Sequence, residues 1–231
     1  MNDKKFTHVY IDTETTGRNH KDCEIVEVAS IEFNLDGEFG ELLHFYCRPL
    51  SGCIPEEAFK IHGVTYDQVK DLEPYIDVGR QKVASFVRRR TLVGHNIAAF
   101  DIFFLKIKPL ALEDSLKLAR RIFPKLSNKL IDFCNRLEVE FKEEFAHGAK
   151  YDATKGAQAY VKAMKLAKEM ESKNSKSLPI FEYHKIQTEA RRMQLINSED
   201  CSKIMAQTWS YSRLELFHQC PFKWMMSYLR N

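Results

Sequence analysis

The sequence predicts an α/β protein, with strands first and helices alternating with short strands afterwards. Three runs near the N-terminus, residues 6–14, 25–33 and 41–49, are rich in β-branched and aromatic residues. The segment between the second and third runs contains Asp36-Gly37, a pair that favours the tight turn of a β-hairpin. From residue 78 onward, apolar residues recur at helical spacing instead. We therefore expect three early antiparallel strands, followed by a part of the chain that is mainly helical.

The middle of the chain alternates between the two patterns. Residues 78–90 predict a helix that ends in three arginines, and residues 91–95, TLVGH, predict a short fourth strand. A fifth strand is expected near Leu110–Leu112. Two further helices are predicted at residues 113–123 and 127–137.

A longer helix is predicted to begin at Asp152. Apolar residues at positions 153, 157, 160, 161 and 164 share one helical face and lysines take the other, so this helix should run to about Met170. The next segment, ESKNSKSLP at 171–179, is polar, lacks periodicity and contains proline, which is typical of a linker. We expect one domain at 1–170 and a short helical C-terminal extension at 180–231.

The composition is that of an ordinary globular protein of 231 residues, 44% of them hydrophobic. Its 35 Lys and Arg against 32 Asp and Glu are too evenly balanced to indicate a nucleic-acid partner from charge alone. The N-terminus lacks the apolar core of a signal peptide, and the most apolar later stretch, residues 92–105, is interrupted by His95, Asn96 and Asp101. The six cysteines are scattered without a CxxC pair, which is typical of reduced thiols. We expect a soluble cytoplasmic protein with no membrane partner.

Two carboxylates stand two positions apart where the first strand ends, in DTETTG at residues 12–17. Residues i and i+2 of a strand point to the same face, so Asp12 and Glu14 should lie side by side, with Gly17 allowing the chain to turn away. Adjacent anions repel each other unless a cation lies between them, and Mg²⁺ or Mn²⁺ prefers such oxygen ligands. Acid pairs at strand ends are also common without a metal, so the pair alone leaves both interpretations open.

Three later residues add to this pattern. Asp101 follows an apolar helical start and is flanked by phenylalanines, an unfavourable place for a carboxylate without a function. His147 stands five residues before Asp152. Taken singly, Asp152 could serve as the N-cap of its helix and His147 as a surface histidine. Those interpretations do not explain why all these residues occur together in this order.

In these motifs the chain resembles the DEDDh family of 3′-to-5′ exonucleases, which includes the proofreading subunit of the bacterial replicative polymerase and ribonuclease T. The resemblance covers roughly residues 6–170, in family order. Its motifs are VYIDTETTG, EIVEVASIEF, IHGVTYDQVKD, LVGHNIAAFDIFFL, EDSLKLARRIFP, NKLIDFCNRLEV and HGAKYDATKGAQAYV. The fold that it implies is ribonuclease H-like, a mixed five-stranded sheet flanked by helices.

The resemblance also implies a mechanism. Two divalent metal ions, Mg²⁺ or Mn²⁺, are implied to have four acidic ligands: Asp12, Glu14, Asp101 and Asp152. Two such ions would activate the attacking water and stabilise the entering and leaving oxygens at the phosphate. His147 is implied to be the general base, a role that suits an imidazole near neutral pH.

Further residues are candidates for contact with the nucleic acid. In the family pattern, backbone N–H groups of the segment after Glu14 approach the terminal 3′-OH. A structural role explains His62 at least equally well, and the three phenylalanines near Asp101 could belong to the core instead of stacking on bases. The arginines at 88–90, with Lys162 and Lys165, could guide phosphates or form an ordinary solvated surface. The candidate substrate contacts are Thr15, Thr16, Gly17, His62, Asn96 and Phe100.

The function expected is a metal-dependent 3′-to-5′ exonuclease that releases 5′ nucleoside monophosphates from single-stranded DNA ends, in repair or proofreading. DNA is preferred because IHGVT resembles the polymerase-associated branch of the family and because the C-terminal segment resembles a DNA recombination module. The alternatives are an exoribonuclease that trims RNA ends, or a catalytically silent module that grips a 3′ end or a protein.

The C-terminal segment does not belong to the exonuclease pattern. Residues 209–229 resemble the opening helix of a RecB-like PD-(D/E)XK nuclease domain, in which a Cys-Pro at the place of Cys220-Pro221 can bind an iron–sulfur cluster with three later cysteines. Those cysteines and the catalytic residues of that family are absent here, so we expect no second nuclease activity in this polypeptide. Residues 180–231 could instead dock a protein partner through aromatic side chains: Trp209, Phe217, Phe222 and Trp224.

Overall fold

The computed structural model of the protein describes residues 5–176 of its 231. The chain divides into two units, residues 1–172 and 173–231, and the sheet belongs to the first. The helical extension predicted at 180–231, with its candidate docking residues, lies outside the described residues.

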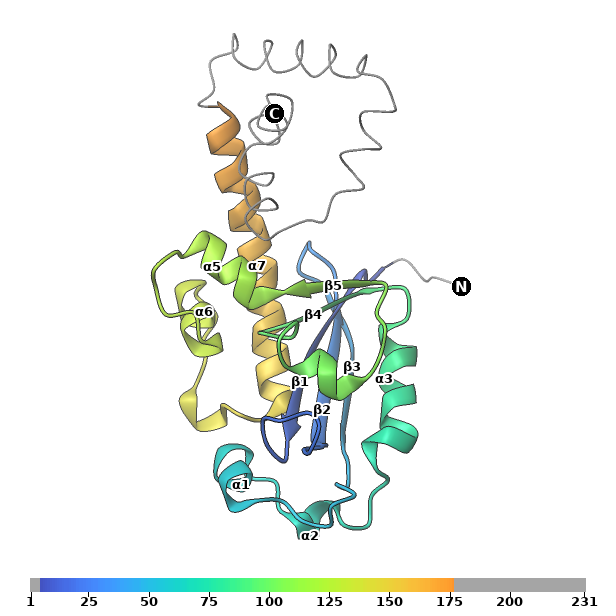
Figure 1. Cartoon of the computed structure of the whole chain (residues 1–231). Helices are drawn as coiled ribbons and strands as arrows, with labels where there is room; N and C mark the ends of the chain where they lie inside the picture. The colour runs from blue at the N-terminus through green and yellow to red at the C-terminus, as the bar shows by residue number, and fades with distance from the viewer. Residues whose placement is uncertain (1–4, 177–231) are drawn as a thin grey trace, which may run out of the picture. The chain divides into compact units, whose positions relative to one another are not determined.

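Five strands form one mixed sheet in the order β3-β2-β1-β4-β5 (Figure 1). β2 pairs antiparallel with both β1 and β3, whereas β4 pairs parallel with β1 and with β5. The prediction of three antiparallel strands followed by two short ones is confirmed. The strands are β1 (His8–Thr15), β2 (Ile25–Phe33), β3 (Phe39–Tyr46), β4 (Thr91–Gly94) and β5 (Ala111–Asp114).

Seven α-helices accompany the sheet in the described residues. A π-helical turn, η1 (Tyr75–Gly79), leads into α3, and a 3₁₀ turn, η2 (Glu143–Phe145), precedes α7. No helix within residues 5–176 is long and apolar enough to cross a membrane. The helices are α1 (Glu56–His62), α2 (Tyr66–Val69), α3 (Arg80–Val87), α4 (Asp101–Leu105), α5 (Ser115–Ile122), α6 (Leu130–Arg136) and α7 (Ala149–Lys176).

All four predicted helices differ from their predicted bounds, and two of the differences have a clear local cause. α3 ends at Val87, because the next residues leave the helical region and Arg89 adopts a left-handed backbone with φ 61°. α7 begins at Ala149, three residues before Asp152, and continues to Lys176, past the expected end at Met170. The first part of the predicted linker, ESKNSK, holds neither Gly nor Pro, so nothing in it stops a helix.

The two faces of the sheet are covered by different helices, and Figure 1 shows α3 and α7 on opposite sides of it. On the α3 face, Val9, Ile11 and Leu92 of the sheet pack with Val83 and Val87 of α3. Phe104 and Leu105 of α4 join the same cluster, so α4 is held against this face by its apolar end.

On the other face, Tyr10 and Val93 pack against alanines that recur every fourth residue along α7, at 149, 153 and 157. These small residues let the helix approach the sheet closely: a Cβ atom at Gly156 would lie 2.4 Å from the ring of Tyr10. Asp12 and Glu14 share the parity of Tyr10 along β1, so they project toward the side that α7 covers. The first turn of α7 therefore comes to lie beside the acidic end of β1.

Candidate active site

The end of β1 carries the first two predicted acids. Asp12 and Glu14 are both partly buried, and Glu14 is paired across the β1–β2 ladder with another acid, Glu27. The ladder shifts register between Glu14 and Thr15, so the strand bends away directly after the second acid. The backbone thus presents carboxylates from two neighbouring strands at one end of the sheet.

The third predicted acid, Asp101, is the first residue of α4 and is only 4% exposed. The sequence had suggested a helix beginning before Asp101, but residues 96–100 form turns and the helix begins at Asp101 itself. The hydroxyl of Thr13, on β1 between Asp12 and Glu14, donates a hydrogen bond of 2.6 Å to Asp101 Oδ1. This buried bond fixes the start of α4 against the acidic end of β1.

The fourth acid and the predicted base come from the entrance of α7. Because α7 begins at Ala149, Asp152 lies in its first turn and is not the N-cap that the simpler interpretation suggested. Asp152 Oδ2 accepts a hydrogen bond of 3.2 Å from the backbone N–H of His147. His147 is exposed and has a left-handed φ of 62°, which turns the chain sharply before the helix.

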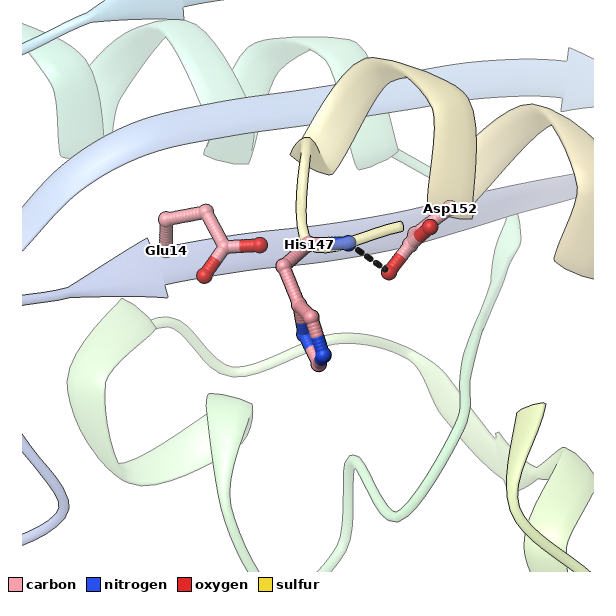
Figure 2. A group of neighbouring side chains, drawn as sticks. All are labelled: Glu14, His147 and Asp152. Atoms are coloured by element: carbon pink, nitrogen blue, oxygen red, sulfur yellow. Dashed lines mark hydrogen bonds between the residues drawn. The ribbon is translucent and has the colours of Figure 1, made fainter. Parts of the chain in front are cut away.

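Three of these side chains meet. Ligand atoms of Glu14, His147 and Asp152 all lie within 4.8 Å of one another, and Figure 2 shows them projecting from β1, the turn before α7 and its first turn. Asp12 and Asp101 stand outside this tight group but are linked to it electrostatically, since the charge of Asp101 raises the pKa of Glu14, and the charges of Glu14 and Asp152 raise the pKa of Asp12. The fold therefore gathers all five predicted catalytic residues at one end of the sheet.

The pKa values show how much negative charge the site concentrates. Burial, and then the charges of Glu14 and Asp101, hold the pKa of Asp12 well above its usual range. Burial, and then the charge of Asp152, raise the pKa of Glu14 to about 9. Burial raises the pKa of Asp152 to about 7, although the N–H of His147 lowers it. Burial also raises the pKa of Asp101 to about 6, against the effect of its hydroxyl partner.

This donor set fits a hard divalent cation. The four acids offer carboxylate oxygens, the ligand atoms that Mg²⁺ and Mn²⁺ prefer. Asp152 Oδ1 is buried and has no hydrogen-bond partner among the described residues, a state that is unfavourable unless a further group binds there. No lysine or arginine among residues 5–172 forms an ion pair with any of the four acids. A bound cation would relieve the repulsion and satisfy the free oxygen.

A fifth acid, Glu27, was not predicted. Its carboxylate is 3% exposed and connects three elements: Oε1 lies 2.7 Å from His44 Nε2 on β3, and Oε2 accepts from the N–H of Ala149, the first residue of α7, at 3.3 Å. Its charge raises the pKa of both Glu14 and Asp152. The signal was present in the sequence, because Glu27 interrupts the apolar run IVEVASI of a strand that is otherwise buried.

The predicted substrate contacts fall into two groups, of which the first lies beside the acids. Thr15 and Thr16 are buried, and the Thr16 N–H donates to Glu24 O at 2.8 Å, so that N–H is already used within the fold. His62 lies beside the backbone of Thr15, and its pKa is lowered by burial and by His147. Its Nδ1 accepts from the chain at Val64, while its Nε2 is buried without a partner among the described residues.

The second group is less clearly placed at the site. Asn96 is exposed in a left-handed turn after β4, where its N–H donates to Asp114 Oδ1 at 3.0 Å. Phe100 is half-buried and its ring lies 4.9 Å from that of Phe104, so it is largely a packing residue. The exposed aromatic of this segment is Phe103, 47% accessible and stacked on His20 with ring centroids 5.0 Å apart.

Comparisons with known proteins match this architecture. The family model described as Exonuclease (RNase_T) matches residues 9–160. DNA polymerase III subunit epsilon of Rickettsia prowazekii (strain Madrid E) is 35% identical over 167 residues, which cover 66% of this chain and 72% of the relative.

Solved structures of exonucleases are also similar to this chain. A structure of Exonuclease X in complex with 5′ overhanging duplex DNA is 26% identical, with a TM-score of 0.58 over 69% of this chain and 92% of that one. E. coli Exonuclease I in complex with a dT13 oligonucleotide shares the fold, with a TM-score of 0.60 at 18% identity over 71% of this chain and 42% of that one. The chain therefore belongs to the exonuclease family, has its ribonuclease H-like fold, and is a 3′-to-5′ exonuclease.

Proposed function

We propose that this exonuclease shortens single-stranded DNA one nucleotide at a time from the 3′ end and releases 5′ nucleoside monophosphates. The observation that carries the proposal is the convergence of Glu14, His147 and Asp152 within 4.8 Å. Asp12 and Asp101 complete an acidic site at the end of β1 that lacks any internal counter-charge among the residues described. Such a site suits the hydrolysis of a phosphodiester, which is itself an anion and must be brought to the acids by a cation.

Asp12, Glu14, Asp101 and Asp152 would hold the divalent ions, Mg²⁺ or Mn²⁺. When bound, such ions lower the pKa of water and stabilise the charge that develops on the phosphate. The chain's own contribution is to fix the carboxylates in advance, through the Thr13 bond to Asp101 and the His147 N–H bond to Asp152. Four carboxylates carry enough charge for two ions, which is the number we propose.

His147 would act as the general base. Its backbone is held by the bond from its N–H to Asp152, while its exposed side chain projects from the turn before α7 (Figure 2). An imidazole can accept a proton from the attacking water near neutral pH, and the exposed position lets it pass that proton to solvent afterwards.

The substrate side of the proposal rests on neighbouring residues and on relatives. The turn at Thr15–Gly17 and the His62 Nε2, which has no partner among the described residues, lie beside the acids, where a terminal nucleotide would bind. Exposed Phe103 offers a face on which a base could stack. DNA is favoured because the two similar solved exonucleases are complexes with DNA and the similar curated protein is a DNA polymerase subunit, which also favours proofreading or repair. A protein partner bound through residues 180–231 stays a prediction.

The proposal is tested with 5′-labelled single-stranded DNA and RNA of the same sequence, incubated with Mn²⁺ or with chelator and resolved on a sequencing gel. We expect a ladder that shortens by single nucleotides only with metal, and faster on DNA. A faster ladder on RNA would replace the DNA assignment with the exoribonuclease alternative. Binding without shortening of either strand would instead favour the silent module.

A further inference from the structure

A groove of about 720 Å³ lies away from the acidic site, between α3 and the segment at 106–110 that leads into β5. Six of its lining residues are charged, and five of these are cations. The charged residues are Asp77, Arg80, Arg88, Arg89, Lys106 and Lys108. The rest of its lining is mostly aliphatic and, among the described residues, contains no aromatic ring.

The five cations lack internal partners within the described part of the chain. None of their side chains forms an ion pair or a hydrogen bond with another described residue, and Asp77 is the only acid in the described lining. Other candidates for a basic rim behave differently: Arg90 pairs with Glu32 at 2.7 Å, and Lys162 and Lys165 donate to backbone carbonyls. The uncompensated positive charge of this region is therefore concentrated in the groove.

Two of the cations occupy unfavourable backbone positions. Arg89 has a φ of 61° and Lys106 a φ of 50°, in the left-handed region that glycine or asparagine enters more easily. Long cationic side chains at such positions carry a conformational penalty of about 1 kcal/mol each. Lys106 takes this conformation as the C-cap of α4 and Arg89 as part of the turn that ends α3, so the ends of these two helices place both cations at the groove.

The groove is connected to the acidic site by α4. This helix starts at Asp101 and ends at Leu105, so Lys106 at its C-terminal end is separated from the site by only about 8 Å of helix, at 1.5 Å per residue. A smaller hollow of about 130 Å³ shares Lys106 with the groove and is also lined by His20, which stacks on exposed Phe103. The stacked pair of Phe103 and His20, and then Lys106, thus lie between the start of α4 and the groove.

From this arrangement we infer that the groove binds the sugar–phosphate backbone of the substrate strand, on the 5′ side of the nucleotide that is removed. The inference rests on the proposed function, because it assigns the 3′ end to the acidic site. Arginine and lysine neutralise phosphates without reading sequence, and a lining without aromatic rings suits contacts to phosphates more than stacked bases. The groove would therefore strengthen binding of any sequence, provided the strand is long enough to reach it.

The dimensions of the sheet indicate how long a strand must be to span from the acids to the arginines of the groove. Thr91, two residues after Arg89 of the groove, pairs with His8 on β1, six residues before Glu14. At about 3.3 Å per residue this is a separation of about 20 Å, equivalent to about six nucleotides at the 3.4 Å spacing of a B-form strand. A trinucleotide at the acids should reach Lys106 at the near end of the groove but not the arginines at its far end, whereas a 20-mer should reach both ends.

The test compares two fourfold variants that remove equal charge. The groove variant is Arg88→Gln, Arg89→Gln, Lys106→Gln and Lys108→Gln. The control variant changes four exposed cations on α5 and α7: Lys117→Gln, Arg121→Gln, Lys162→Gln and Lys168→Gln. Steady-state kinetics are measured on the trinucleotide and the 20-mer over a range of salt, with thermal melting to establish that all three proteins are folded.

We expect the groove variant to raise KM for the 20-mer at least tenfold at low salt, with kcat unchanged and with a much smaller rise in KM for the trinucleotide, which meets only Lys106 among the replaced cations. The slope of log KM against log salt should fall by about 0.7 for each phosphate that the groove no longer neutralises, or about 3 in total. The control variant should resemble the wild type. If the groove and control variants share the same KM and the same salt slope on the 20-mer, the groove does not bind the strand.

Binding measured with chelator separates this inference from the proposed function. Fluorescence anisotropy of a labelled 20-mer needs no turnover, so weaker binding by the groove variant would support the groove even if no strand were cut. If instead the groove variant keeps DNA binding but no longer binds labelled polyglutamate, an acidic protein segment is the ligand and the nucleic-acid assignment is wrong.

Discussion

Replacing Glu14 by glutamine should stabilise the metal-free protein at high pH while abolishing its activity. The pKa of Glu14 is raised from 4.5 to about 9 in the folded protein, so the folded state holds its proton more tightly than the unfolded state. The contribution of protonated Glu14 to the free energy of unfolding is therefore fully present below pH 4.5 and is lost as the pH rises toward 9. A glutamine side chain at this position has nearly the same shape as glutamate but carries no charge, so the variant avoids this loss of stability at high pH.

The magnitude follows from the pKa difference. At pH 8 the gap from 4.5, at about 1.4 kcal/mol per pH unit, sets an upper limit of about 5 kcal/mol. Glu14 is only partly buried, and water and side-chain movement screen its charge, so we expect about 1–2 kcal/mol. For a domain of this size that gain corresponds to a rise in Tm of about 2–8 °C.

The assay is thermal unfolding with chelator at pH 5 and pH 8. Glu14→Gln should melt higher than the wild type at pH 8 and close to it at pH 5. The control Glu144→Gln, which removes an exposed acid within η2, should melt at the wild-type temperature at both pH values. Adding Mn²⁺ should stabilise the wild type more than Glu14→Gln. A variant that is no more stable at pH 8, or that differs equally at both pH values, would refute the charge-repulsion account.

Three further changes test individual residues. Asp12→Ala should abolish metal-dependent turnover while circular dichroism shows an unchanged fold, and retained activity with Mg²⁺ would contradict its role as a ligand. Glu27→Gln should lower kcat about tenfold or more, because it weakens the anchor between His44 and the start of α7; unchanged kinetics would make Glu27 merely structural. Phe103→Ala should raise KM for single strands about fivefold or more with little effect on kcat, as expected when a base can no longer stack on the ring, and an equal fall in kcat would point to misfolding instead.

Local patterns predicted the sheet well because its strands obey simple rules. The run at 25–33 became β2 with the predicted bounds, and the Asp36-Gly37 turn joins it to β3, with Gly37 at a φ of 103° that favours glycine. The order of the five strands could not be read from periodicity, because β4 and β5 join by parallel pairing across long connections. The family resemblance predicted a mixed five-stranded sheet, but the order of its strands came only from the structure.

Helix ends were harder to predict because they depend on contacts that are distant in sequence. Asp152 suggested an N-cap, yet the chain begins its helix at Ala149, whose N–H is accepted by Glu27 on β2. The acid at position 27 stood out in its apolar run, but its role could not be assigned from the sequence, because its partners lie on β3 and α7 and only the folded chain brings them together. Likewise, spacing alone could not decide which phenylalanine near Asp101 faces solvent, and Phe103, not Phe100, is the exposed one.

The central claim is that four carboxylates from β1, α4 and α7 hold the metal that the exonuclease uses. Diffraction from crystals soaked in Mn²⁺, recorded at the manganese absorption edge, tests it most directly. The account predicts anomalous peaks bound by Asp12, Glu14, Asp101 and Asp152, and their loss in crystals of Asp152→Asn. Peaks elsewhere, or none at this site in crystals of protein that degrades DNA in Mn²⁺, would contradict it.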